Sequence, residues 1–497
     1  MTAETRGYLE KARNIMKQQR YYESLDNVIY CDREFQLPKG GWDYMDEMQG
    51  FFQKQCEQQL LSKETKEILD YFKAHGTDEL ENDYQKGCIR SLQKKYERAT
   101  KIPAEFLTER DQFCARAQAA WKEAHEKADF SIFAPWLEKQ FALQKRIAAA
   151  WNPDQSAYDS LLQQWDEGIS TAFVTEKIEA VKGELIALCK KVIKKCKDVD
   201  RSRLDEPLDR EINKRLADKA VDLIGFDRSR GTIQEVLHPV CVCLGPRDSR
   251  PTTNYNTPWM AVISLTHECG HGIYNYSSND EAVSYGLWGG IEGMMHESQS
   301  RFYENMICRT KAFWKNLYPT VQKEIPKFAS IPFDDFAAML FKPSFSKMRI
   351  RADELTYNLH IIIRFEMERD YFEGKLAIED FPKVWKEKYQ QYLGVTPEND
   401  REGILQDVHW ASGHVGYFQS YFLGDLYAAQ VHHKLMQEIP DLYERIENGD
   451  VKCVHTWMIE HIYQYGQTYT PEELLLKVTG EALNPRYYIE YLKEKYE

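Results

Sequence analysis

Three residues near the middle of the chain have the types and spacing of a catalytic metal site. His267, Glu268 and His271 form a His-Glu-x-x-His pattern. Four residues make slightly more than one helical turn, so both imidazoles leave the same helix face and can bind one cation. Zinc prefers neutral imidazole nitrogen, and its catalytic sites keep one position for water, which Glu268 can reach as a general base. The pattern therefore predicts hydrolysis.

The flanking residues predict that this helix is buried. Residues 259–265 are mainly apolar, and Ile273, Tyr274 and Tyr276 continue the apolar character. Two histidines and a glutamate inside such a helix need partners, because burying a charge without one is costly. A chance match on a surface helix is therefore disfavoured.

A site with two histidines needs a third protein ligand, and a glutamate on a following helix commonly supplies it. One such helix is predicted over residues 293–310. The acidic candidates are Glu281, Glu292, Glu297 and Glu304. Glu297 is favoured because it lies in an apolar segment with Met294, Met295 and Phe302. Spacing alone leaves the other three candidates open.

The composition is that of a globular protein, with 497 residues, 43% hydrophobic content and a formal charge of −13. The negative charge argues against nucleic acid or an anionic membrane as a partner. The N-terminus has no apolar signal region, and no run of about eighteen apolar residues predicts a membrane span. Eleven scattered cysteines fit a reducing compartment. We therefore expect a cytoplasmic location.

The elements around the motif predict an all-α fold in one unit, residues 1–497. Helical periodicity dominates an N-terminal half, residues 1–225. The catalytic half, residues 226–497, begins with apolar, β-branched segments at 232–236, 240–245 and 249–255, which predict a small antiparallel sheet before the metal helix. Further helices are expected over 345–374, 377–394 and 416–440, with a polar loop at 395–413.

Together these segments resemble the carboxypeptidase Taq family of metallocarboxypeptidases, which are multi-helix enzymes with a deep central groove, similar to neurolysin. The motifs that carry the resemblance, beside His267–His271, are His296-Glu297-Ser298-Gln299, Asp248-x-Arg250-x-Thr252, Gly403-x-x-Gln406-Asp407-x-His409-Trp410 and Met348-Arg349-x-x-Ala352-Asp353. The last has methionine where the family has isoleucine, a change that conserves volume.

The resemblance implies that His267, His271 and Glu297 bind one Zn²⁺ per subunit, with Co²⁺ as another possible ion, and that Glu268 is the general base. A second donor must stabilise the oxyanion of the transition state. His409 is the best candidate for it, with Tyr421 or Tyr417 as alternatives.

The resemblance also assigns residues to substrate binding and to support of the metal site. Arg349 is expected to bind the terminal carboxylate of a peptide, although an ion pair with Asp353 at i+4 is the alternative. Asp248, Arg250 and Thr252 fit substrate contact or a structural turn network equally well. Gln406 and Tyr417 are assigned to the substrate side. The residues expected behind the metal ligands are His296 and Gln299, which would orient Glu297, and Asp353.

The implied function is a metal-dependent carboxypeptidase that releases single residues from peptides with a free C-terminal carboxylate, and the resemblance implies a homodimer. An oligopeptidase or dipeptidyl carboxypeptidase of the same helical class is the alternative within enzymes. A helical peptide-binding scaffold with a purely structural zinc is the alternative outside them.

Overall fold

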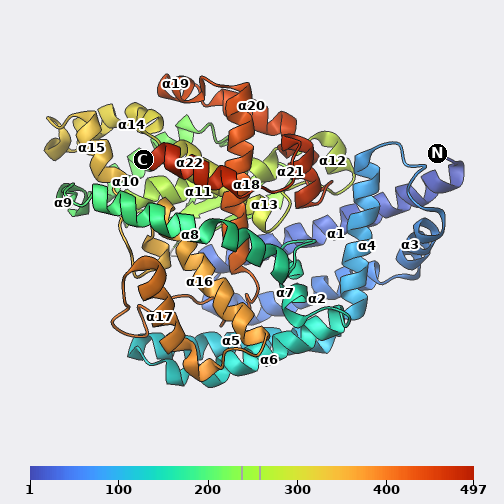
Figure 1. The fold of residues 1–497 in the computed structure, drawn as a ribbon. Coiled ribbons are helices and arrows are strands. Elements are labelled where there is room, and N and C mark those ends of the chain that lie inside the picture. Colours follow the sequence, from blue (N-terminus) through green and yellow to red (C-terminus); the bar gives the residue numbers. More distant parts are fainter. Residues whose placement is uncertain (237–238, 257–258) are drawn as a thin grey trace.

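The computed structural model describes residues 1–236, 239–256 and 259–497. It is a body of helices with one small sheet, so the expected fold class is confirmed. Helix α18 (Phe418–Glu438) runs through the middle of the molecule, and the first four helices, within residues 3–101, lie toward the right of Figure 1.

The N-terminal half is helical throughout its described length. Its helices are α1 (Ala3–Phe35), α2 (Trp42–Leu60), α3 (Lys63–His75), α4 (Asp83–Lys101), α5 (Ala104–Lys127), α6 (Ala134–Trp151), α7 (Ala157–Trp165), α8 (Thr171–Lys195), α9 (Ser202–Asp205) and α10 (Arg210–Leu223). Ser62 caps α3 by accepting a hydrogen bond from the Thr65 amide, which satisfies one of the free N–H groups of the first turn.

The sheet contains β1 (Gln234–Glu235), β2 (Cys241–Gly245) and β3 (Asp248–Thr253), in the order β1-β3-β2. Strands β2 and β3 form the expected antiparallel hairpin, with Cys241 opposite Pro251. Strand β1 instead pairs in parallel with β3, with Gln234 opposite Thr252, so the prediction of a wholly antiparallel sheet is wrong. The chain reverses direction twice between β1 and β3, which makes these two strands run the same way.

The catalytic half supplies the helices around the motif. They are α11 (Met260–Tyr276), α12 (Asp280–Ser284), α13 (Met294–Arg301), α14 (Lys311–Glu324), α15 (Phe333–Leu340), α16 (Glu354–Phe372), α17 (Phe381–Leu393), α18, α19 (Leu442–Glu447), α20 (Lys452–His461), α21 (Pro471–Thr479) and α22 (Arg486–Tyr496). A π-helix, η3 (Phe302–Cys308), continues α13 where the sequence predicted regular helix, and it carries Glu304. Single-turn π segments inside helices are frequent at functional sites.

Short 3₁₀ turns complete the described elements. They are η1 (Lys39–Gly41), η2 (Phe130–Ile132), η4 (Pro326–Phe328), η5 (Arg349–Arg351), η6 (Ile378–Asp380) and η7 (Tyr463–Tyr465).

The helix predicted over 345–374 begins only at Glu354. Asp353 caps it by accepting from the Thr356 amide, and the same carboxylate accepts from the Ser344 amide. A short acidic side chain competes for backbone N–H groups and favours this capping position over a helix interior. Arg349 therefore lies in the turn η5, before the helix.

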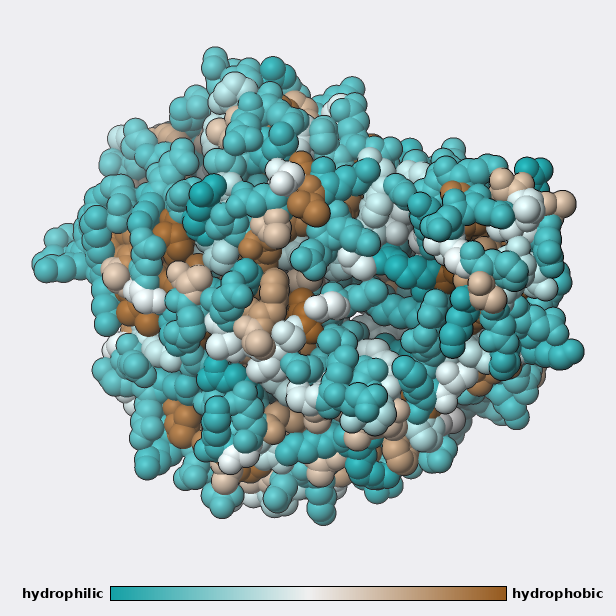
Figure 2. Space-filling model, turned by 45° about the vertical axis from the view of Figure 1, so that its right-hand side comes forward, coloured by the Kyte–Doolittle hydropathy of each residue, from teal (hydrophilic) through white to brown (hydrophobic). Residues whose placement is uncertain are grey.

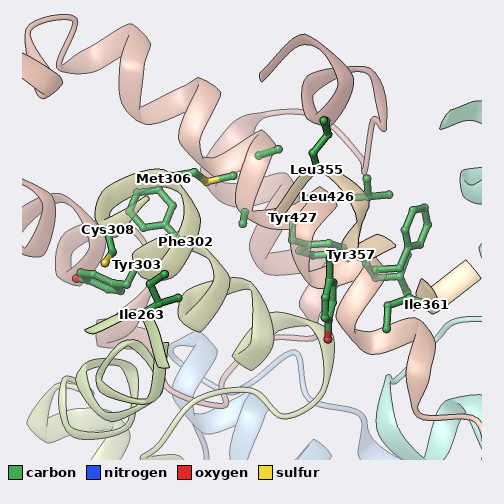
Figure 3. Packing of buried hydrophobic residues seen from close by; sticks show 14 of the residues in the cluster. Ile263, Phe302, Tyr303, Met306, Cys308, Leu355, Tyr357, Ile361, Leu426 and Tyr427 are labelled. Atoms are coloured by element: carbon green, nitrogen blue, oxygen red, sulfur yellow. The ribbon is translucent and has the colours of Figure 1, made fainter. Parts of the chain in front are cut away.

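Helices α11, α13, α16 and α18 pack closely around the motif. Gly270 of α11 lies against α13, where an added Cβ would be 2.9 Å from the Ser300 Cα. Figure 3 shows the buried side chains that fill the interior beside these helices, among them Ile263, Phe302, Tyr303, Met306, Leu355, Ile361 and Leu426. The hydroxyl of Tyr357 points away from the labelled apolar residues. This core holds the functional helices at fixed distances.

The face seen in Figure 2 is mainly hydrophilic, with apolar residues in small separate groups and a hollow to the right of its centre. Across the described part of the chain, no helix combines the length and apolar character needed to cross a membrane.

Candidate active site

The motif histidines and one glutamate converge on a single point. His267 and His271 lie on α11 and Glu297 on α13, and one ligand atom from each lies within 4.8 Å of the other two. The Glu297 carboxylate is 3.5 Å from His271 Nε2 and 3.9 Å from His267 Nε2. Among the four acidic candidates, Glu297 is therefore the one that the structure brings to the two histidines.

Glu304 orients the first histidine. Its Oε2 accepts from His267 Nδ1 at 2.9 Å, so Nδ1 carries a hydrogen and Nε2 is the nitrogen directed at Glu297. Arg301 and Arg309 hold the Glu304 carboxylate at 2.9 and 3.0 Å. The sequence predicts Glu304 only as a possible metal ligand. The signal for its ion-paired role is the presence of Arg301 three residues before it and Arg309 five residues after it.

His296 orients the second histidine. Its Nδ1 lies 2.6 Å from His271 Nδ1, and its Nε2 lies 2.8 Å from the Asn275 side-chain oxygen. Burial, together with the nearby His271, lowers the pKa of His296 to about 3, so its ring is neutral. A neutral His296 that donates from Nε2 to Asn275 accepts at Nδ1, which leaves the Nε2 lone pair of His271 free.

Two of the expected contacts to Glu297 are not formed. His296 contacts His271 instead, and Gln299 accepts from the Tyr463 hydroxyl at 3.0 Å while donating to Ser298. Both residues share a helix turn with Glu297, but their side chains leave α13 toward other neighbours. Asp353, also expected behind the ligands, caps α16.

The charges at this centre fit a bound cation. Burial raises the pKa of Glu297, but His267 and His271 outweigh it and hold that pKa at about 2. Burial lowers the pKa of His267, but Glu297 and Glu304 raise it to about 9. Glu297 Oε1 is buried without a hydrogen-bond partner among the described residues. Two imidazole nitrogens, which become donors once deprotonated, and a carboxylate oxygen form a set suited to zinc or a similar divalent ion.

Glu268 lies beside these ligands and is also buried. Burial raises its pKa, while His267 and His271 oppose the shift. A carboxylate with a raised pKa accepts a proton more readily, as a general base must.

The Arg349 guanidinium uses some of its N–H groups in hydrogen bonds to neighbouring side chains and leaves one nitrogen available. Its Nε donates to Asp407 at 2.9 Å and its Nη1 to the Tyr357 hydroxyl at 3.0 Å. Its Nη2 has no partner within the described residues. The alternative of an i,i+4 ion pair with Asp353 is wrong, because Arg349 precedes the helix. The geometry suits recognition of a carboxylate by a pre-oriented guanidinium.

Gln406 supports Arg349. Its oxygen accepts from the Arg349 amide at 2.8 Å, and its nitrogen donates to backbone carbonyl oxygens, including that of Lys347 at 3.1 Å. Both ends of its amide are thus engaged within the protein. The expectation that Gln406 faces the substrate does not fit this arrangement.

His409, Tyr417 and Tyr421 form an aromatic cluster near Arg349. The ring centroid of His409 is 6.0 Å from that of Tyr417, which is 5.2 Å from Tyr421, and the Arg349 guanidinium is 5.4 Å from the Tyr421 ring. Burial, and secondarily Arg349, lowers the pKa of His409 to about 3. Burial raises the pKa of both tyrosines. The cluster therefore contains neutral groups that can donate hydrogen bonds. Tyr357, which sequence analysis missed, lies beside it at 6.2 Å from Tyr421.

The residues on β3 are tied into the sheet. Arg250 pairs with Asp248 at 3.0 Å, and the Thr252 hydroxyl bonds to both the amide and the carbonyl of Val240 at 2.8 Å. These contacts correspond to the structural alternative, and Asp248 and Arg250 remain partly exposed.

Two buried carboxylates hold the site together from a distance. Asp166 of the N-terminal half accepts from the Met294 amide and the Ser420 hydroxyl, at the starts of α13 and α18. Glu368 accepts from the Trp410 indole at 2.6 Å and the Gly416 amide at 2.9 Å, which anchors the loop that carries His409. No local pattern in the sequence marks either residue.

A polar cavity of about 290 Å³ lies next to the metal-binding residues. Its wall includes His296 and Asn275 on one side and Arg20 and Asn27 of α1 on the other. Arg20 stacks on Trp288 at 3.8 Å. The N-terminal half thus supplies one wall of the space beside the site.

Comparison with known proteins places this arrangement among metallopeptidases. A sequence model described as carboxypeptidase Taq (M32) metallopeptidase matches residues 11–496. The chain is 36% identical to carboxypeptidase 1 of Bacillus subtilis over 97% of both chains, and 33% identical to thermostable carboxypeptidase 1 of Pyrococcus furiosus over 95% of this chain and 94% of that one.

Solved structures of carboxypeptidases resemble the fold of this chain over nearly its whole length. A Pyrococcus furiosus carboxypeptidase structure superposes with a TM-score of 0.93 at 32% identity, over 100% of this chain and 99% of that one. The M32 carboxypeptidase of Deinococcus radiodurans gives a TM-score of 0.92 at 29% identity, over 99% of each chain.

Proposed function

Because the chain belongs to the carboxypeptidase Taq (M32) family of metallopeptidases, and is therefore a metal-dependent peptide hydrolase, we propose that it releases single amino acids from peptides with a free C-terminal carboxylate. One Zn²⁺ per subunit is the proposed ion, with Co²⁺ as an alternative that the same donors accept. The observation that carries the proposal is the pairing of a His₂Glu donor set with the free Nη2 edge of Arg349.

His267, His271 and Glu297 would hold the metal ion, which when bound polarises the scissile carbonyl and lowers the pKa of water. Glu304 and His296 keep the two imidazoles in the tautomers that present Nε2 to it. Glu268 takes a proton from the attacking water and delivers one to the leaving amine. Its raised pKa suits both transfers.

The remaining residues bind the peptide and stabilise the transition state. Neutral His409 donates an N–H to the oxyanion that develops in the transition state, and the Tyr421 phenol is the second donor of this kind. Arg349 binds the terminal carboxylate of the peptide through Nη2, while Asp407 and Tyr357 hold its other nitrogens in place. Recognition of the terminal carboxylate by Arg349 restricts cleavage to the C-terminal end of the peptide.

Mass spectrometry of a peptide digested by the metal-loaded protein tests the proposal, with the C-terminally amidated peptide run in parallel. A ladder of single-residue losses from the free acid alone is the expected result. Dipeptide losses or internal fragments would identify a dipeptidyl carboxypeptidase or an oligopeptidase instead. The variant Glu268→Gln is expected to keep its metal content and lose turnover, and undiminished turnover would refute the assigned mechanism.

We further propose a cytoplasmic homodimer. All eleven cysteines are free, which agrees with a reducing compartment. Light scattering coupled to size-exclusion chromatography tests the oligomeric state, and the mass of a single 58.5 kDa chain would exclude the dimer.

A further inference from the structure

A second cavity, of about 1000 Å³, lies at the junction of α8, α14, α15, α18, α19 and α22. Helices α14, α15, α19 and α22 are grouped in the upper left of Figure 1. Much of its wall is apolar, including Val192, Ala312, Ala337 and Phe341. None of the residues assigned above to the reaction lines it, and its size is that of a small-molecule site.

The charged residues on the inner wall are cations. Arg309 and Lys495 are largely buried. Lys342 is partly buried and donates to backbone carbonyl oxygens, including that of Val199 at 2.6 Å. The acidic residues of the lining are exposed to solvent, and they are Glu444, Glu447 and Glu494.

Arg309 has a free edge in this wall. Its Nε and Nη2 both donate to Glu304 Oε1, at 3.2 and 3.0 Å, and no partner of Nη1 is found among the described residues. A guanidinium with unused N–H groups in an apolar cavity matches a ligand that joins one carboxylate to an apolar body. A neutral apolar ligand would leave this donor unpaired.

The same arginine connects the cavity to the metal-binding residues. Arg309 holds Oε1 of Glu304, whose Oε2 accepts from His267 Nδ1 at 2.9 Å. A ligand carboxylate bound at the free Nη1 edge would place a second anion on the same guanidinium and weaken the attraction between Arg309 and the Glu304 carboxylate. The orientation of His267 would then be less restrained, and loss of such supporting contacts weakens metal binding.

We propose that this cavity binds small apolar carboxylates, and that its occupation lowers the affinity of the His267–His271–Glu297 site for its divalent ion through Arg309 and Glu304. The residues that line this cavity do not include His267, Glu268, His271, Glu297 or Arg349. Binding there would allow such acids to regulate the enzyme without competing with substrate.

Isothermal titration of the full-length, metal-free protein with 4-phenylbutyrate tests the binding step. One saturable site is expected, and the neutral 4-phenylbutanamide should bind at least about tenfold more weakly because it cannot form the charged pair with Arg309. Equal binding of the acid and the amide would overturn the assignment of a carboxylate ligand.

The coupling is tested by zinc competition with a chromophoric chelator. Saturating 4-phenylbutyrate should raise the zinc dissociation constant about tenfold, the lower end of the range for losing a supporting contact. Ala338→Trp, on the exposed rim of the cavity, should abolish the effect without changing zinc affinity in the absence of the acid. An unchanged effect in Ala338→Trp would assign it to direct contact with the metal or with Arg349. Binding that leaves zinc affinity unaltered would exclude the coupling. Neither measurement depends on peptidase activity, so each stands apart from the proposed function.

Discussion

Gly424 of α18 lies directly against the metal-ligand candidate Glu297: a Cβ added at position 424 would be 3.0 Å from both the Cβ and the Cγ of Glu297. The absence of a side chain at Gly424 lets α18 approach α13 closely enough for Tyr421, one turn earlier, to stand near the metal-binding residues. The contact between Gly424 and Glu297 thus limits how closely α18 and α13 can pack.

The variant Gly424→Ala should lower zinc affinity and the melting temperature together. Glycine to alanine inside a helix normally stabilises by about 0.5–1 kcal/mol, but here the methyl group must displace the Glu297 side chain or the helix, and overpacking costs about 1–3 kcal/mol. Calorimetry and zinc competition measure the two effects. Gly183→Ala in α8, where nothing lies within 4 Å of an added Cβ, is the matched control and should raise the melting temperature. Similar behaviour of the two variants would contradict this reading.

Glu304→Gln should weaken zinc binding by about 10- to 100-fold, because an amide is a poorer acceptor for His267 Nδ1–H and leaves Arg301 and Arg309 without their shared anion. Glu281→Gln is the control, since Glu281 was an equally open ligand candidate in the sequence but bonds to Asn82 in the structure. Zinc affinity that falls equally in both variants, or in neither, would remove Glu304 from its supporting role.

Contacts between residues close together in the sequence could be predicted, whereas contacts between residues far apart in the sequence could not. The convergence of His267 and His271 follows from helix geometry over four residues, and the structure agrees. The apolar segment around Glu297 favours it, and the family resemblance selects it, but spacing alone leaves four candidates because the position of Glu297 depends on how α13 crosses α11. Asp166 and Glu368 act across more than a hundred and more than forty residues, respectively, so no periodic pattern reveals them.

The two wrong structural predictions, for Arg349 and for β1, each have a cause in the local sequence. Arg349 was placed inside a helix because residues 345–374 carry helical periodicity, but Asp353 competes as a cap and starts the helix later. That change moves Arg349 from the helix surface to a contact with Asp407, 58 residues away. Likewise β1 has a strand-like composition, but alternation does not specify whether a strand pairs in parallel or antiparallel.

Arg349→Lys should reduce kcat/KM on free-acid peptides by about 10- to 100-fold, since lysine keeps the charge but loses the planar fork that contacts Asp407, Tyr357 and the carboxylate together. Arg351→Lys, two residues away and exposed, should leave kcat/KM unchanged. Steady-state kinetics on matched acid and amide peptides measure the effect. A loss that is equal on both substrates would show that Arg349 does not read the carboxylate.

The carboxyl group of Glu368 predicts a pH-dependent term in stability. Burial, opposed by donation from Trp410, Gly416 and Tyr158, raises the pKa of Glu368 from 4.5 to about 7 in the folded protein. The folded state therefore binds this proton more tightly than the unfolded state does. The stabilisation it provides is complete below pH 4.5 and is lost as the pH rises through about 7, an effect of about 3 kcal/mol.

Glu368→Gln cannot titrate, so the unfolding free energy of the wild type minus that of the variant should fall by about 3 kcal/mol between pH values of about 4.5 and about 8. Other groups titrate equally in both proteins and cancel in the difference. Urea denaturation at several pH values measures it, with Glu379→Gln, at an exposed position, as the control substitution. If the Glu368→Gln difference is also constant, the carboxyl group is ionised in the folded protein throughout this range. The loop that carries His409 would then be anchored by a charged acceptor at the acidic end of the range as well.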